Sequence, residues 1–132
     1  MKTNIKLCIF DLDFTLHNEI VFLKKAFIDN KPILGICSGF QILCVIFGER
    51  IVDSKEIGMT NVITTQNNPL ISGEFQAYNM HNFSAKIPIT FNILAKTEET
   101  IQLVSHKELN IFGVLFHPEV RNEQIVTNFL LI

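Results

Sequence analysis

Cys37 stands at the centre of the sequence G-I-C-S-G, residues 35–39, a spacing that can set up a nucleophile. The apolar residues 32–36 predict a short buried strand, and residues 38–47 predict a helix. A nucleophile at such a corner adopts a strained backbone conformation and needs minimal side chains two residues to either side, which the two glycines supply. The first N–H groups of the helix would favour the thiolate. The alternative interpretation is a structural cysteine, because free cysteine is among the most buried residue types.

A histidine and a carboxylate that could activate this thiol lie 80 residues further along, in the sequence H-P-E. Residues 113–116 predict an apolar strand that ends at His117, and Glu119 follows two positions later. His117 could take the proton from Cys37, and Glu119 could hold the imidazole in the useful tautomer. A lone histidine at a strand end is more often a surface or core residue than a base. Its combination with a nucleophile corner is what favours a Cys–His–Glu triad.

A second possible chemistry lies in the sequence D-L-D-F-T at residues 11–15, which follows another apolar segment. This pattern resembles the first motif of haloacid-dehalogenase-type phosphatases, in which Asp11 would be the nucleophile and both Asp11 and Asp13 would help to hold magnesium. Such a metal site needs a later acidic pair, whereas the only later aspartates are Asp29 and Asp53. Carboxylates that cap the following helix are therefore the favoured interpretation of Asp11 and Asp13.

A sheet must position these residues, and the hydrophobic pattern predicts an α/β fold. Residues 5–10 predict a first strand, and apolar residues three and four positions apart predict a helix that ends near residue 28. A right-handed crossover then places residues 32–36 parallel to the first strand. The expected architecture is a flavodoxin-like parallel sheet flanked by helices, with antiparallel strands added from the middle of the chain. The later expected elements are strands at residues 50–53, 59–64, 73–78, 91–95, 100–105 and 112–116 and a final helix at residues 123–131.

The nucleophile segment and the H-P-E sequence together resemble the class I glutamine amidotransferases, with G-I-C-x-G-x-Q at residues 35–41. The resemblance runs from about residue 31 to residue 132. Three further segments are most similar to the glutaminase subunit or domain of GMP synthases: residues 55–60, 80–82 and 91–95.

The resemblance implies a domain that hydrolyses glutamine through a thioester on Cys37 and releases ammonia, without a cofactor. It assigns Cys37 as the nucleophile, His117 as the base and then the acid, and Glu119 as the residue that orients the imidazole. The same Cys–His–Glu set was indicated by the residue types and their order along the chain.

The resemblance also assigns Ser38, Gly39, Gln41 and His81 to the substrate site. The backbone N–H of Ser38 would donate to the oxyanion of the tetrahedral intermediate. Gln41 would help to hold glutamine, although without the family context an ordinary polar helix residue is an equally good interpretation. His81 stands where the family has a histidine in a Ser-His-Gly-Asp-like segment, and we expect it to line the site without belonging to the triad.

The chain departs from the family in the oxyanion region. Asp11, Leu12 and Asp13 stand where the family has glycines, one of whose N–H groups stabilises the oxyanion. The sequence also lacks the family's first strand–helix–strand–helix segment, so we expect residues 1–132 to form one shortened domain. Two hypotheses follow: a weak glutaminase with a degenerate oxyanion loop, and a non-catalytic remnant that serves for binding or regulation. The intact Cys–His–Glu set favours the first, and the altered loop favours the second.

The composition is typical of one globular domain. Of the 132 residues, 48% are hydrophobic and 18% are charged, and the net charge of −2 favours neither nucleic acid nor an anionic membrane as a partner. Cys8, Cys37 and Cys44 are odd in number and lack metal-ligand spacing, which favours a reduced, cytoplasmic setting over disulfides or a metal site. Cys44 lies among apolar residues and is expected in the core. No signal peptide or membrane span is predicted.

The partners that the sequence implies are glutamine and a synthetase that acts in trans. The chain contains no domain that would consume ammonia, and the resemblance indicates an ATP pyrophosphatase of the GMP-synthase type, and hence purine biosynthesis. We also expect a homodimer. If the family's neighbouring strands are missing, residues 5–10 form an exposed sheet edge, and pairing with a second copy is its simplest cover.

Overall fold

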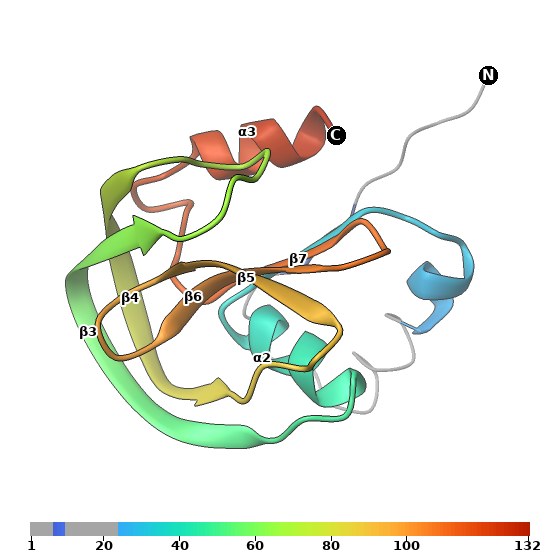
Figure 1. Ribbon diagram of the computed structural model, residues 1–132, viewed down its shortest axis with the longest axis horizontal. Coiled ribbons are helices and arrows are strands. Elements are labelled where there is room, and N and C mark those ends of the chain that lie inside the picture. Colours follow the sequence, from blue (N-terminus) through green and yellow to red (C-terminus); the bar gives the residue numbers. More distant parts are fainter. Residues whose placement is uncertain (1–6, 10–23) are drawn as a thin grey trace.

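The computed structural model describes residues 7–9 and 24–132, and its architecture is α/β (Figure 1). Within these residues, seven strands form one mixed sheet in the order β1-β2-β7-β6-β5-β3-β4. Strands β1 (Leu7–Ile9), β2 (Ile33–Ile36) and β7 (Ile111–Val114) are parallel. The remaining neighbours in the sheet pair antiparallel. The predicted parallel sheet with added antiparallel strands is therefore confirmed.

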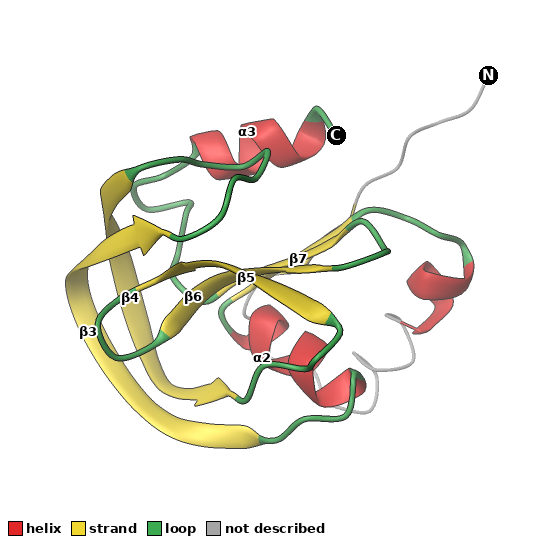
Figure 2. Ribbon diagram, in the orientation of Figure 1, coloured by secondary structure: helices red, strands yellow, loops and turns green. Residues whose placement is uncertain are grey.

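Helices α2 and α3 cover opposite faces of the sheet (Figure 2). Helix α2 (Ser38–Ile46) follows β2 directly and lies against one face, and α3 (Gln124–Leu130) lies against the other. Residues 24–28, which precede β2, are also helical. The central strands are buried on both faces, so their side chains alternate between two cores. The α3-side core includes Leu34, Leu103, Val114 and Phe129, and the α2-side core includes Ile33, Phe40, Val104 and Ile111.

The antiparallel strands are longer than the sequence predicted. Strand β3 (Ile51–Thr64) joins the two strands expected at residues 50–53 and 59–64, and β4 (Glu74–Ala85) runs well past the expected end at residue 78. A register irregularity between Asp53 and Glu56 lets β3 continue through a polar stretch in which the pattern indicated no strand. The other two strands, β5 (Phe91–Lys96) and β6 (Ile101–His106), lie close to their predicted positions.

The long β3–β4 hairpin curves round one side of the molecule (Figure 1). Strand β4 is the last in the sheet order, whereas β2 and β7 lie near the opposite end of that order. Nevertheless, the backbone of β4 contacts Cys37, which follows β2, and His117, which lies just after β7. The sheet is therefore curled. This curl returns β4 to the carboxyl ends of the parallel strands, where binding sites of α/β sheets are found.

Candidate active site

Cys37 occupies the strand-to-helix corner that the sequence predicted. It follows β2 immediately and is the N-cap of α2, with φ 55° and ψ −104°. A positive φ is uncommon for a residue other than glycine, and such strain is characteristic of functional positions. The Cys37 amide donates to the carbonyl of Val114 on β7 at 2.8 Å, which fixes the corner against the neighbouring strand.

Close packing explains the glycine two residues before the nucleophile. A Cβ at Gly35 would lie 2.7 Å from the carbonyl oxygen of Gly39, in the first turn of α2, and 2.7 Å from Cδ1 of Leu43. Helix α2 also packs closely on β7, where a Cβ at Gly113 would lie 2.9 Å from the ring of Phe40. The G-x-C-x-G spacing therefore lets the nucleophile helix lie directly against the sheet.

His117 and Glu119, the residues that the sequence predicted as base and orienting carboxylate, contact each other. Their Nδ1 and Oε1 atoms are 2.6 Å apart, and the His117 side chain is 16% exposed. Because a carboxylate accepts the Nδ1 proton, the Nε2 atom is the nitrogen that can take a proton from a nucleophile. The His117 amide donates to the carbonyl of Tyr78 on β4 at 2.8 Å, so the histidine is also held through its backbone.

The outer edge of β4 gathers Cys37 and His117 in one place. The Cys37 Sγ atom lies 3.8 Å from the carbonyl oxygen of Met80, and the His117 amide binds the carbonyl of Tyr78. Carbonyls two residues apart in a strand point to the same side and lie about 6.7 Å apart. In addition, β2 and β7 pair in parallel, so both residues lie at the same end of neighbouring strands. Cys37 and His117, the candidate nucleophile and base, are thus both held by the backbone of β4.

Ser38, Gly39 and Gln41 lie in the first turn of α2, next to the thiol. The amide of Ser38 is the first of the helix and has no acceptor within the helix, as an oxyanion donor requires. Its hydroxyl is buried and has no partner among the described residues. The Gln41 side chain donates to the carbonyl of Phe83 on β4 at 2.9 Å, which ties α2 to the same strand. Its role toward a substrate stays a prediction.

The oxyanion region and the second possible chemistry lie outside the described residues, because Asp11, Leu12 and Asp13 fall between residues 10 and 23. The interpretation of Cys44 as a core residue is confirmed. Its side chain is fully buried, and burial, with a smaller contribution from the charge of Glu49, raises the pKa of Cys44 to about 12. Cys44 is therefore a thiol with no tendency to ionise.

His81 belongs to a buried polar cluster inside the curled sheet. Its Nδ1 atom lies 2.8 Å from the carbonyl oxygen of Ser54, and its Nε2 atom lies 3.1 Å from Oε1 of Glu56. The expected contact of His81 with a substrate stays a prediction. The sequence reasoning assigned no role to Glu56, whose only signal was its place in the K-E-I-G segment of the resemblance.

Within residues 24–132 and the three residues of β1, no group of three or more His, Cys, Asp or Glu side chains is arranged to hold a metal ion. In the same part of the chain, none of the helices has the length and apolar character needed to cross a membrane.

Comparison with known proteins agrees with this geometry. The family profile of glutamine amidotransferase class-I matches residues 12–130. A GMP synthase from Caldicellulosiruptor saccharolyticus is 36% identical over 125 residues, which cover 86% of this chain and 24% of that protein. A glutamine-hydrolysing GMP synthase subunit from Methanococcus maripaludis is 36% identical over 109 residues, which cover 74% of this chain and 58% of that protein. The chain thus spans between about a quarter and three fifths of these relatives.

Solved structures give the same result for the fold. A crystal structure from Thermoplasma acidophilum, described as that of a GMP synthase subunit, superposes with a TM-score of 0.78 at 28% identity, covering 86% of this chain and 63% of that one. A glutamine amidotransferase from Thermotoga maritima has the same fold, with a TM-score of 0.74 at 20% identity over 88% of this chain and 52% of that one. From the profile match, the relatives and the corner at Cys37, we conclude that the chain belongs to the glutamine amidotransferase class-I family.

Proposed function

We propose that this chain is a glutaminase domain that hydrolyses glutamine to glutamate and ammonia. The observation that carries the proposal is the gathering of a strained corner cysteine and a carboxylate-bound histidine along one edge of β4. Membership of the amidotransferase family supports the same reaction. The described residues include candidates for the nucleophile, the base, its orienting carboxylate and one oxyanion donor, whereas the region expected to hold a second donor lies outside them.

In the proposed reaction, Nε2 of His117 takes the Cys37 proton, and the sulfur attacks the side-chain amide carbon of glutamine. The amide of Ser38 donates to the oxyanion of the tetrahedral intermediate. The C–N bond then breaks, and His117 returns its proton to the leaving nitrogen, which departs as ammonia. His117 then deprotonates a water molecule, whose oxygen attacks the thioester carbon; the C–S bond breaks, glutamate leaves, and the Cys37 sulfur takes the proton back from His117. Glu119 stabilises the imidazolium that forms twice in this cycle.

Ammonia released in this way needs a consumer, and we propose that a synthetase in trans provides it. One of the relatives is named as a GMP synthase and another as a subunit of such an enzyme, which supports an ATP pyrophosphatase of that type. In this pairing the chain would serve purine biosynthesis in the cytoplasm.

A non-catalytic binding or regulatory subunit is the second candidate function. The observation that favours it is the sequence D-L-D at residues 11–13, where the family has oxyanion-loop glycines. The two candidates differ in a direct assay of glutamine hydrolysis, performed on the pure chain with and without a GMP-synthase-type ATP pyrophosphatase.

We expect slow hydrolysis that the partner stimulates, and Cys37→Ala should abolish it. Cys44→Ala is the matched control, because it removes a thiol from the same helix and should leave the rate per folded molecule unchanged. No hydrolysis under either condition would favour the binding subunit. Hydrolysis that survives Cys37→Ala would refute the role of Cys37, and magnesium-dependent release of phosphate from a phosphate ester would instead point to Asp11 and phosphatase chemistry.

A further inference from the structure

A buried carboxylate–imidazole pair, Glu56 and His81, lies beside the candidate active site and has no part in the chemistry proposed above. The carboxylate of Glu56 on β3 meets the ring of His81 on β4, and their side chains are 9% and 1% exposed. Gln102 of β6 donates to the same carboxylate at 2.7 Å, and the hydroxyl of Thr97 donates to it at 3.0 Å. Donors from three separate segments therefore converge on Glu56.

The contacts define the charge of Glu56 and the orientation of the His81 ring. Burial alone would raise the pKa of Glu56, but the hydrogen bonds from His81, Gln102 and Thr97 outweigh it and hold that pKa below its usual range. Glu56 is therefore ionised. The two ring nitrogens of His81 face the Ser54 carbonyl oxygen and a Glu56 carboxylate oxygen, so hydrogen bonds fix the ring from both sides.

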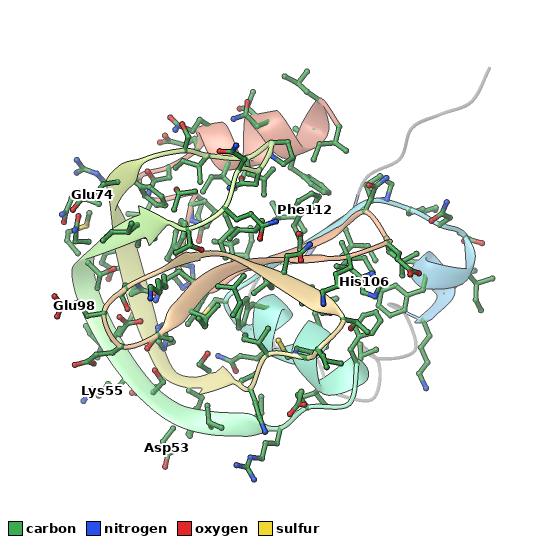
Figure 3. The ribbon with its side chains drawn as sticks, in the orientation of Figure 1. Asp53, Lys55, Glu74, Glu98, His106 and Phe112 are labelled. Carbon is green, nitrogen blue, oxygen red and sulfur yellow. The ribbon has the colours of Figure 1, made fainter. Side chains whose placement is uncertain are left out.

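Few other charges reach this pair. Among the described residues, Glu56 is the charged group in contact with the His81 ring, at Nε2. The other ring nitrogen, Nδ1, faces the uncharged carbonyl of Ser54. Glu98 and Glu99, in the turn between β5 and β6, line a cavity of about 310 Å³ together with Glu56 and are exposed. Figure 3 shows Glu98 at the outside of the molecule.

The pair lies against a face of β4, whereas the contacts with the candidate active site are made by backbone carbonyls at the strand's edge. Asn79 and His81 point into the curled sheet, where the Asn79 amide donates to Thr60 at 2.7 Å and to Gln102 at 3.1 Å. Met80 lies between them, and its carbonyl contacts the Cys37 sulfur. The residues on both sides of this carbonyl are thus anchored in the polar cluster.

We propose that Glu56 and His81 are positioning residues, which fix β4 so that its outer edge holds Cys37 and His117 in their mutual arrangement. The irregularity in β3 between Asp53 and Glu56 contributes to the same positioning, because the carbonyl of Ser54 at that point contacts the His81 ring. The catalytic meaning of this inference rests on the proposed glutaminase function, whereas the structural coupling can be measured without it.

Amide hydrogen exchange tests the coupling in Glu56→Gln and His81→Gln, with Glu98→Gln as the matched control. We expect exchange at the His117 amide, which binds the Tyr78 carbonyl, to become about tenfold faster in both variants, the factor that follows from losing a charge-assisted hydrogen bond. Exchange at the Cys37 amide, which binds β7, should not change, and Glu98→Gln should affect neither. Equal acceleration at both amides, or none at His117, would overturn the proposal.

The ring contacts of His81 are tested by nitrogen-15 spectra of labelled histidine. Both ring nitrogens of His81 should show hydrogen bonds in the wild type, and Glu56→Gln should change the signal of Nε2 more than that of Nδ1. A wild-type ring with a nitrogen that makes no hydrogen bond would contradict the inferred contacts.

Kinetics separate positioning from substrate contact. If glutamine hydrolysis is observed, we expect Glu56→Gln and His81→Gln to lower kcat by about tenfold or more with little change in KM. A rise in KM with unchanged kcat would mean that His81 contacts glutamine, and the positioning role would be wrong. A wild-type chain without hydrolysis would end the proposed function, while the exchange and ring measurements still decide the coupling.

Discussion

Replacement of Gly35 with alanine tests whether close packing at the strand-to-helix corner positions the nucleophile. The new Cβ would lie 2.7 Å from the Gly39 carbonyl oxygen and 2.8 Å from its carbon. It would also lie 2.7 Å from Cδ1 of Leu43, a fully buried side chain with little room to move. Because Gly39 is backbone in the first turn of α2, the helix start has to shift, and Cys37 must shift with it.

The expected magnitude follows from this overlap. Overpacking of a close-packed site costs about 1–3 kcal/mol, so Gly35→Ala should lower the free energy of unfolding by that amount in urea titrations. A displacement of about 1 Å at a reacting group can cost 10²-fold in rate. We therefore expect glutamine hydrolysis per folded molecule to fall by about that factor, which is more than the loss of stability alone would produce.

Gly48→Ala is the matched control at the far end of the same helix. Its φ is 99°, and an added Cβ would meet nothing within 4 Å, so the substitution causes backbone strain without a steric clash. A cost of about 1–2 kcal/mol with unchanged activity is expected. The reasoning would be refuted if the free energy of unfolding of Gly35→Ala lay within about 0.5 kcal/mol of the wild-type value and the variant kept its activity.

Further predictions concern the thiols, the loop, pH and assembly. Both Cys37 and Cys44 are buried, but burial raises the pKa of Cys44 to about 12, whereas Cys37 lies at the start of α2; brief iodoacetamide treatment followed by mass spectrometry should therefore label Cys37 in preference. Replacing Leu12 and Asp13 with glycine should raise glutamine hydrolysis about tenfold or more, because glycine can turn an N–H toward the oxyanion; a wild-type rate already near 1–10³ s⁻¹ would contradict this. Burial lowers the pKa of His106, whose neutral ring accepts two amide hydrogen bonds in the following turn. The stability that this ring contributes is thus present above about pH 6.5 and lost as the pH falls, so His106→Asn should flatten the acid side of the stability profile, and an unchanged profile would refute the assignment. Sedimentation at micromolar concentration should show a dimer if β1, the last strand at its end of the described sheet, pairs with a second copy; a monomer would contradict this.

The corner at Cys37 could be predicted from the sequence because its signals are local. An apolar run gives β2, an amphipathic run gives α2, and two glycines mark the turn between them. The contact of His117 with Glu119 is local as well, since the two residues are two positions apart. Local signals of this kind depend on residue type and spacing, which are visible in a single sequence.

The full length of β3 could not be predicted in the same way. Residues 54–58 contain a serine, two charged side chains and a glycine, which indicate an interruption between two strands. Moreover, Glu56 faces inward while Ile57 is 62% exposed, which reverses the usual alternation of a half-buried strand. The inward charge is tolerated because donors from β4, β6 and the segment after β5 satisfy it.

The support of the candidate site was beyond prediction for a more general reason. The partners of Cys37 and Glu56 come from residues 43 and 46 positions away, Met80 and Gln102, and only the curled sheet brings them together. The groups of β4 that contact Cys37 and His117 are the backbone carbonyls of Met80 and Tyr78. Because every residue has a backbone carbonyl, the residue types at these two positions give no signal. Side-chain patterns can therefore indicate which residues are candidates for the chemistry, whereas the strand that holds them becomes visible only when the register of β4 is known.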